Sequence, residues 1–240
     1  TASPLVADLA GHQGDISGAV FSPDESQVLS WGADKTARIW NVEAGEAVAS
    51  IPHEGAITSA QFFDQGRRVV TTDDSGNVRM FSAADGAESG PAIKVESAAY
   101  GVTFSPDESV MLLREGLRTS RLVMRKTADG AAVGEPFAFE GIGRGARFSQ
   151  DGKRFLMWSE GGAQIRDAGN GAVLTDGMRL PQGMAGAAFS PDETKVLGWS
   201  GSMSQGNAAQ LWDAATGQPV GGPMQHFGAV THAGFVDDGR

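Results

Sequence analysis

The sequence contains no cysteine among its 240 residues, so disulfide bonds and cysteine-ligated metal sites are excluded. Basic residues are in the minority, because 19 Lys and Arg stand against 29 Asp and Glu and give a formal net charge of −10. Nucleic acid and anionic membranes also carry negative charge, so neither is an expected partner. The chain has no apolar run near the ~18 residues of a membrane-spanning helix and no visible signal peptide. These features favour a cytoplasmic protein.

Recognisable catalytic motifs are also missing. The sequence has no GxxxxGK[ST] phosphate-binding loop, no GxSxG nucleophile motif and no His-Glu-x-x-His metal motif. The stretch GIGRGA (141–146) matches a loose dinucleotide-binding pattern, but it leads into a turn instead of a helix. Asp24, Asp107, Asp151 and Asp192 stand at four similar turns, where an aspartate accepts hydrogen bonds from the local backbone. We therefore expect no catalytic residue, no metal and no cofactor.

What the chain does contain is 34 glycines and an internal repeat of about forty residues. A phrase built on phenylalanine, most often Phe-Ser-Pro-Asp, recurs at spacings of 41, 42, 44, 41 and 46 residues. Its phenylalanines are Phe21, Phe62, Phe104, Phe148, Phe189 and Phe235. Between them lie short apolar runs split by Pro-Asp and Gly turns, a pattern typical of antiparallel strands. Four such strands in about forty residues make one blade of a propeller.

The repeat predicts an all-β fold, a β-propeller of four-stranded antiparallel blades forming a single domain over residues 1–240. The expected units run approximately over residues 11–52, 53–94, 95–138, 139–179, 180–225 and 226–240. Five of them are complete blades and the sixth is partial. We expect the first five phenylalanines to be buried at equivalent places, one in each blade.

Several landmarks resemble the WD-repeat family, and its bacterial members especially. The first unit has Gly11-His12 and the segment SWGADKTARIW, with Trp40-Asn41 where the family has Trp-Asp, and the fifth unit contains LWDAATG. The resemblance implies a buried polar network inside a blade, which is structural because satisfied buried polar groups hold strands in register. The matching residues are His12, Ser30, Asp34 and Trp40 in the first unit and His53, Thr71 and Asp74 in the second.

The resemblance also implies binding of a protein or peptide by the loops around that histidine. The candidate binding residues are Gln13, Asp15, Glu54, Asp73, Glu96, Glu140 and Phe227. Most of them are carboxylates, so a basic peptide is the expected ligand. The sequence thus predicts a non-catalytic scaffold or sensor module of a larger protein. The alternative is a propeller enzyme, a glycosidase- or lactonase-like hydrolase, whose carboxylates or histidines would converge in a central channel.

The ends of the chain carry a further prediction. Residues 3–10 match the outermost strand of a last blade, and residues 226–240 match only the innermost strand of a sixth. We expect a fragment of a longer protein with six or seven blades, and an incomplete ring. A closed five-bladed ring with two spare strands is the alternative. An open ring has exposed strand edges, which predicts edge-to-edge association between copies.

Overall fold

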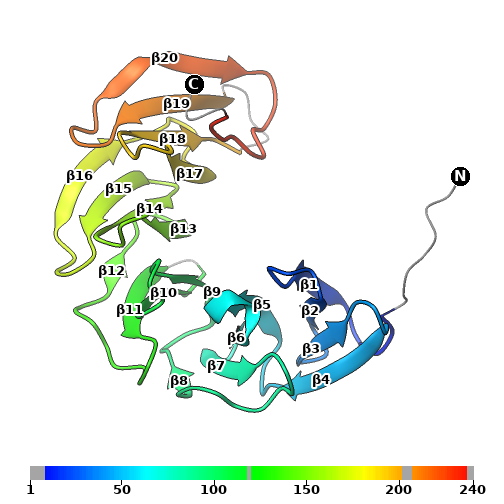
Figure 1. Ribbon diagram of the computed structural model, residues 1–240. Helices are drawn as coiled ribbons and strands as arrows, with labels where there is room; N and C mark the ends of the chain where they lie inside the picture. The colour runs from blue at the N-terminus through cyan, green and yellow to red at the C-terminus, as the bar shows by residue number, and fades with distance from the viewer. Residues whose placement is uncertain (1–8, 118–119, 202–206, 237–240) are drawn as a thin grey trace, which may run out of the picture. The chain divides into compact units, whose positions relative to one another are not determined.

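The computed structural model describes residues 9–117, 120–201 and 207–236, and in this part of the chain the one helix is the 3-10 turn Asp64–Gly66. All other regular structure in these residues is β-sheet. Twenty strands form five antiparallel sheets, and in each sheet four strands that are consecutive in the sequence lie side by side in chain order (Figure 1). The predicted all-β fold of four-stranded antiparallel blades is confirmed.

The bounds of the strands follow the forty-residue repeat. The first sheet contains β1 (Ile16–Phe21), β2 (Gln27–Gly32), β3 (Thr36–Asn41) and β4 (Glu46–Pro52). The second contains β5 (Ile57–Phe63), β6 (Arg68–Asp73), β7 (Asn77–Ser82) and β8 (Ile93–Lys94). The third contains β9 (Ala99–Phe104), β10 (Val110–Glu115), β11 (Arg121–Lys126) and β12 (Phe137–Ala138). The fourth contains β13 (Gly143–Phe148), β14 (Arg154–Ser159), β15 (Gly162–Asp167) and β16 (Val173–Met178). The fifth contains β17 (Gly186–Phe189), β18 (Lys195–Trp199), β19 (Asn207–Asp213) and β20 (Pro219–His226).

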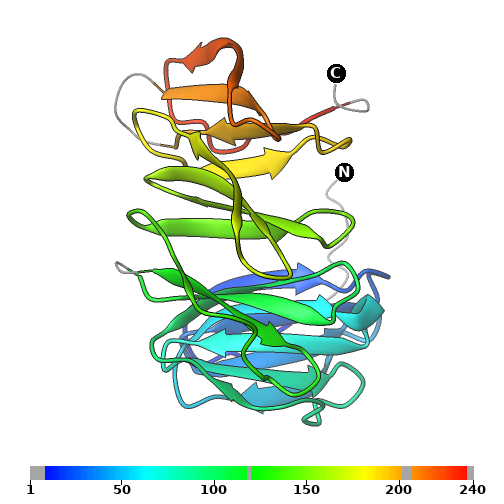
Figure 2. The same cartoon turned by 90° about the vertical axis from the view of Figure 1, so that its left-hand side faces the viewer.

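Two compact units make up the chain, and the division runs through the third sheet. The first unit is Thr1–Val102 with Arg125–Ala132, and the second is Thr103–Met124 with Val133–Arg240. In the second unit the fourth and fifth sheets lie one upon the other (Figure 2). The site and the cavity described below each lie within a single unit.

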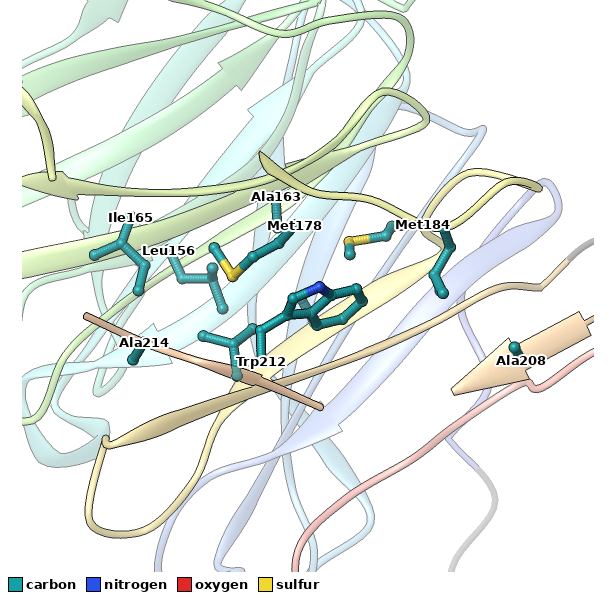
Figure 3. Packing of buried hydrophobic residues seen from close by; sticks show 11 residues of the cluster. Leu156, Ala163, Ile165, Met178, Met184, Ala208, Trp212 and Ala214 are labelled. Atoms are coloured by element: carbon teal, nitrogen blue, oxygen red, sulfur yellow. The ribbon is translucent and has the colours of Figure 1, made fainter. Parts of the chain in front are cut away.

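The core of each unit is formed where the face of one sheet packs on the face of the next. In the first unit, Leu29 and Ile39 of the first sheet pack with Ile57, Val69 and Phe81 of the second. In the second unit, Trp212 of the fifth sheet reaches toward Met178 and Met184 (Figure 3). Burial of such faces is the main favourable term in the stability of a repeat protein.

The repeated phenylalanines occupy equivalent register positions but are not equally buried. Phe21, Phe62, Phe148 and Phe189 each pair with the first buried residue of the next strand. Phe148 is 7% exposed, Phe62, Phe104 and Phe189 are half-buried, and Phe21 is 58% exposed, so the expectation that all five are buried is met only by Phe148 and fails most clearly in the first sheet. The reason is tertiary. Phe62, Phe148 and Phe189 contact the preceding sheet, and among the described residues no element of the first unit covers the corresponding face of β1.

A second regularity pairs tryptophan with glycine across the first two strands of three sheets. Trp31, Trp158 and Trp199 are the cross-strand partners of Gly18, Gly145 and Gly186. Each indole lies so close to its glycine that a Cβ atom would have no room. In the second sheet the same pair is Ser59 and Thr72. The glycine therefore accommodates a large ring on the neighbouring strand, which is a different role from the turn glycines of the repeat.

The expected inner strand of a sixth blade is not formed. β20 ends at His226, and residues 227–236 contain no strand. Val230 donates a backbone hydrogen bond to the Ser200 carbonyl (3.1 Å), and Val230, Ala233 and Phe235 pack against Leu197 and Trp199 of the fifth sheet. Apolar contact thus replaces the ladder that a strand requires. The expected outer strand over residues 3–10 falls largely on residues 1–8, which lie outside the described part, and residues 9 and 10 are not in a strand.

Candidate functional site

Loops of the first unit meet in a continuous row at one end of its sheets. We define this loop row as residues 12–15, 32–35, 53–56, 74–76 and 95–97. Backbone hydrogen bonds join its neighbours: the His53 N–H donates to Lys35 (2.8 Å), Asp74 to Ala56 (3.0 Å) and Val95 to Gly76 (2.9 Å). The row is therefore tied together by the main chain as well as by the sheets beneath it.

A buried polar network supports the row from within the first sheet. His12 Nδ1 lies 2.8 Å from Asp34 Oδ2, and His12 Nε2 lies 2.8 Å from Ser30 Oγ. The Trp40 indole N–H donates to the same Ser30 hydroxyl at 2.8 Å. The structure thus brings together His12, Ser30, Asp34 and Trp40, and the chain of bonds ties β2, β3 and the turn between them to the loop before β1.

The Asp34 carboxylate also fixes the loops directly, because it accepts the Gln13 N–H (2.9 Å) and the Thr36 N–H (3.1 Å). Burial by itself would raise the pKa of Asp34. Hydrogen bonds from Gln13, His12 and Thr36 outweigh it and hold the pKa of that carboxyl well below its usual range. The carboxylate is therefore ionised at neutral pH.

The second sheet holds an equivalent network, with one difference from the expected set. His53 Nδ1 lies 3.0 Å from Asp73 Oδ2, and His53 Nε2 lies 2.7 Å from Thr71 Oγ1. The partner is Asp73 and not Asp74, because Asp73 is the last residue of β6 and points inward, whereas Asp74 is on the exposed loop. Asp73 also accepts hydrogen bonds from the backbone N–H groups of Ser75 (3.0 Å) and Asn77 (2.8 Å).

Burial lowers the pKa of His53, and the nearby Asp73 only partly opposes this effect. A neutral imidazole has one donor nitrogen and one acceptor nitrogen. Because a carboxylate can only accept, His53 Nδ1–H donates to Asp73, and Nε2 accepts from the Thr71 hydroxyl. Phe81 takes the place of tryptophan and packs edge-on against the imidazole, with ring centroids 6.3 Å apart.

The candidate binding residues divide between the two units. In the first unit, Gln13, Asp15, Glu54 and Glu96 are exposed on the loop row. Asp73 is fully buried in the second network, so its assignment to a binding surface is wrong, and the neighbouring Asp74 is exposed instead. In the second unit, Glu140 forms a two-point ion pair with Arg179 at 2.9 and 2.7 Å. Phe227 is fully exposed directly after β20.

The third, fourth and fifth sheets lack the histidine network. Their residues at the histidine position are Val95, Phe139 and Leu180, and those at the serine or threonine position are Leu113, Met157 and Gly198. Val95, Leu180, Leu113 and Met157 are all buried. The first two sheets alone therefore combine exposed carboxylates with polar support beneath them.

Over residues 9–117, 120–201 and 207–236, no three His, Cys, Asp or Glu side chains come together in a way that could hold a metal ion. In the same residues, no helix has the length and apolarity to cross a membrane.

Comparison with known proteins gives an independent view. The family model "WD domain, G-beta repeat" matches residues 3–41 and 45–82. Rat apoptotic protease-activating factor 1 is 29% identical over 45% of this chain, which corresponds to 10% of that protein's length. Serine-threonine kinase receptor-associated protein of Dictyostelium discoideum is 23% identical over 98% of this chain and 78% of its own. The crystal structure of the computationally designed Ika8 protein superposes with a TM-score of 0.75 at 21% identity, covering 97% of this chain and 69% of that one, which shows the fold alone. The matched repeats and the related sequences make this chain similar to WD-repeat proteins, and its five sheets built to one plan agree with that likeness.

Proposed function

We propose that this chain is a non-catalytic binding module for a protein or peptide, and that the loop row of the first unit is its docking surface. The observation that carries the proposal is the row itself. Exposed acidic side chains stand on successive loops that backbone hydrogen bonds and two buried histidine networks hold in place. A surface that is ordered before binding loses less entropy when the partner docks.

Charge favours a basic partner. Asp15, Glu54 and Asp74 are exposed and form no ion pair within the described part of the chain. A lysine or arginine of a partner can approach them without breaking an existing pair. The second unit differs, because its candidate Glu140 is already held by Arg179. Long-range attraction between opposite charges speeds encounter and selects the partner.

The relatives support a binding role in general terms. The Dictyostelium protein, which matches nearly this whole chain, is named for its association with a receptor. The propeller fold also supplies no catalytic group by itself, since function on a fold depends on the particular site.

The test is a binding titration with a labelled Lys- and Arg-rich peptide, using an acidic peptide of the same length as the probe control. The variant Glu54→Lys/Asp74→Lys reverses two charges of the loop row. We expect its affinity for the basic peptide to fall by at least about tenfold, with a weaker dependence on salt.

The matched control is Glu43→Lys/Glu46→Lys, which makes the same change in net charge at the exposed β3–β4 turn of the same unit. It should bind the basic peptide within about twofold of the unchanged chain, because mutations at a distant surface rarely alter a site. Equal losses in the two double variants would mean that overall charge alone attracts the peptide, and the loop row would then not be the docking surface.

A further inference from the structure

The fourth sheet contains a cavity where the first two sheets hold their histidine networks. Its volume is about 250 Å³, and its wall includes Phe139, Met157 and Arg166. Phe139 stands at the histidine position, Met157 at the serine or threonine position, and Arg166 at the position of Trp40 and Phe81. The register is the same, because Arg166 pairs with Phe155 just as Trp40 pairs with Val28. An arginine thus replaces an aromatic ring inside a blade.

The Arg166 guanidinium is half-buried and has no carboxylate partner in the described residues. Nη1 donates to the Gly171 carbonyl (2.8 Å) and Nη2 to Gln164 Oε1 (3.1 Å), while Nε is buried without a hydrogen-bond acceptor. The cation also lies 5.3 Å from the centre of the Phe137 ring. Burial also lowers the pKa of Arg166. A positive charge withdrawn from water in this way is costly unless an anion is bound beside it.

The remaining charges of the cavity wall nearly cancel. Arg179 and Glu140 both line it, are largely exposed and form the ion pair described above. Gln164 and Ser159 supply the other polar side chains of the wall. The lining therefore has two guanidinium groups and one carboxylate, a net positive charge that comes from Arg166.

We propose that this cavity binds a small oxyanion, either a carboxylate or a phosphate group, with Arg166 as the charged residue that holds it. The planar guanidinium presents donors in a fork that matches the oxygens of both groups. The volume exceeds that of a cavity able to hold benzene, about 150 Å³, so a group of this size enters without rearrangement of the sheet. The loop row of the first unit takes no part, and the two sites are independent.

The experiment titrates the full chain separately with inorganic phosphate and with glutarate, each at constant ionic strength. The readout is the side-chain Nε–H NMR signal of Arg166, together with calorimetric affinity. We expect a saturable shift of this signal. A response to phosphate alone assigns a phosphate ligand, and a response to glutarate alone assigns a carboxylate.

Arg166→Gln should weaken the binding by about tenfold or more, because the oxyanion loses its charged hydrogen-bond donor. The matched control is Arg125→Gln, which removes an arginine at the equivalent position of the third sheet, where it does not line this cavity. It should leave the affinity unchanged. Equal weakening by both variants would overturn the proposal.

Glu140→Gln tests the site without altering its interior, since the Glu140 side chain is 66% exposed. Removing this carboxylate takes a competing negative charge from the cavity wall, so oxyanion affinity should rise several-fold. If the Arg166 signal responds to neither anion in the unchanged chain and in Glu140→Gln, the cavity is not an oxyanion site.

Discussion

The first two sheets and the fourth sheet fill the same interior positions in opposite ways. The first two use a histidine with serine or threonine, and both ring nitrogens of His12 and of His53 have a partner. The fourth uses Phe139, Met157 and Arg166, and leaves a cavity and a guanidinium nitrogen without a partner. One backbone register therefore accepts either a satisfied polar network or an apolar filling. In the fourth sheet, which mixes an apolar filling with a charged residue, Arg166 has no carboxylate partner among the described residues.

The largest difference between the two kinds of sheet is expected at the repeated phenylalanine. Phe148→Ala should lower the free energy of unfolding by about 3–5 kcal/mol, because it leaves a hole in a packed interface between sheets. Phe21→Ala, at the same position of the first sheet, should cost under about 1 kcal/mol, since the ring is 58% exposed. Chemical denaturation of both variants measures this difference. Similar losses would show that the face of β1 is covered in solution.

The next effect concerns the buried aspartate of the second network. Asp73→Asn should lower the free energy of unfolding by about 2–3 kcal/mol, because the amide cannot accept all the donors that meet the carboxylate. Asp74→Asn changes the adjacent exposed residue and should stay within about 0.5 kcal/mol of the unchanged chain. Urea denaturation followed by circular dichroism gives both values. A larger cost at Asp74 would contradict the network described here.

A smaller effect is expected from Trp40→Phe, which gives the first sheet the ring that the second already has. The variant loses the indole hydrogen bond to Ser30 and should cost about 1 kcal/mol. Phe81→Leu provides the comparison in the second sheet, where the ring that is replaced has no hydrogen-bond donor. Thermal unfolding of both variants separates the polar contribution from packing. No change in Trp40→Phe would mean that the network does not stabilise the first sheet.

The smallest change in stability is expected when the pH is lowered. The pKa of His53 is lower in the folded chain than its ordinary value near 6.5, so the unfolded chain binds more protons between these two values. The contribution of His53 to the free energy of unfolding should therefore be fully present above pH 6.5 and decrease as the pH falls below it. Asp34 and Asp73, whose pKa values are also lowered, should add a further loss below their ordinary value of 3.8.

Denaturation midpoints measured from pH 7.5 to 3 check this profile. Replacing His53 with Asn should flatten the part near pH 6. Replacing the exposed His226 with Gln should leave the profile unchanged. A profile that stays the same without His53 would contradict the assignment.

Much of the fold could be predicted from residue spacing, because the turns recur with the repeat and each strand between them has one register. The resemblance to WD repeats also identified His12, Ser30, Asp34 and Trp40, which lie in one network. It failed at Asp73 because two adjacent aspartates differ only in which one ends the strand, and a step of one residue turns a side chain from the interior to the loop. The cavity of the fourth sheet was missed, although Arg166 at an aromatic position was visible in the sequence.

The sequence by itself determined the type of fold and the number of strands in each repeat, since these depend on local turn chemistry and on alternation along the chain. Only the tertiary structure decided which equivalent residues are buried. Phe21 and Phe148 share one sequence position, but Phe148 has a neighbouring sheet. It also decided that residues 227–236 pack on Trp199 without forming a strand. Burial is a property of the surface that another element covers, and that element lies a full repeat away in the chain.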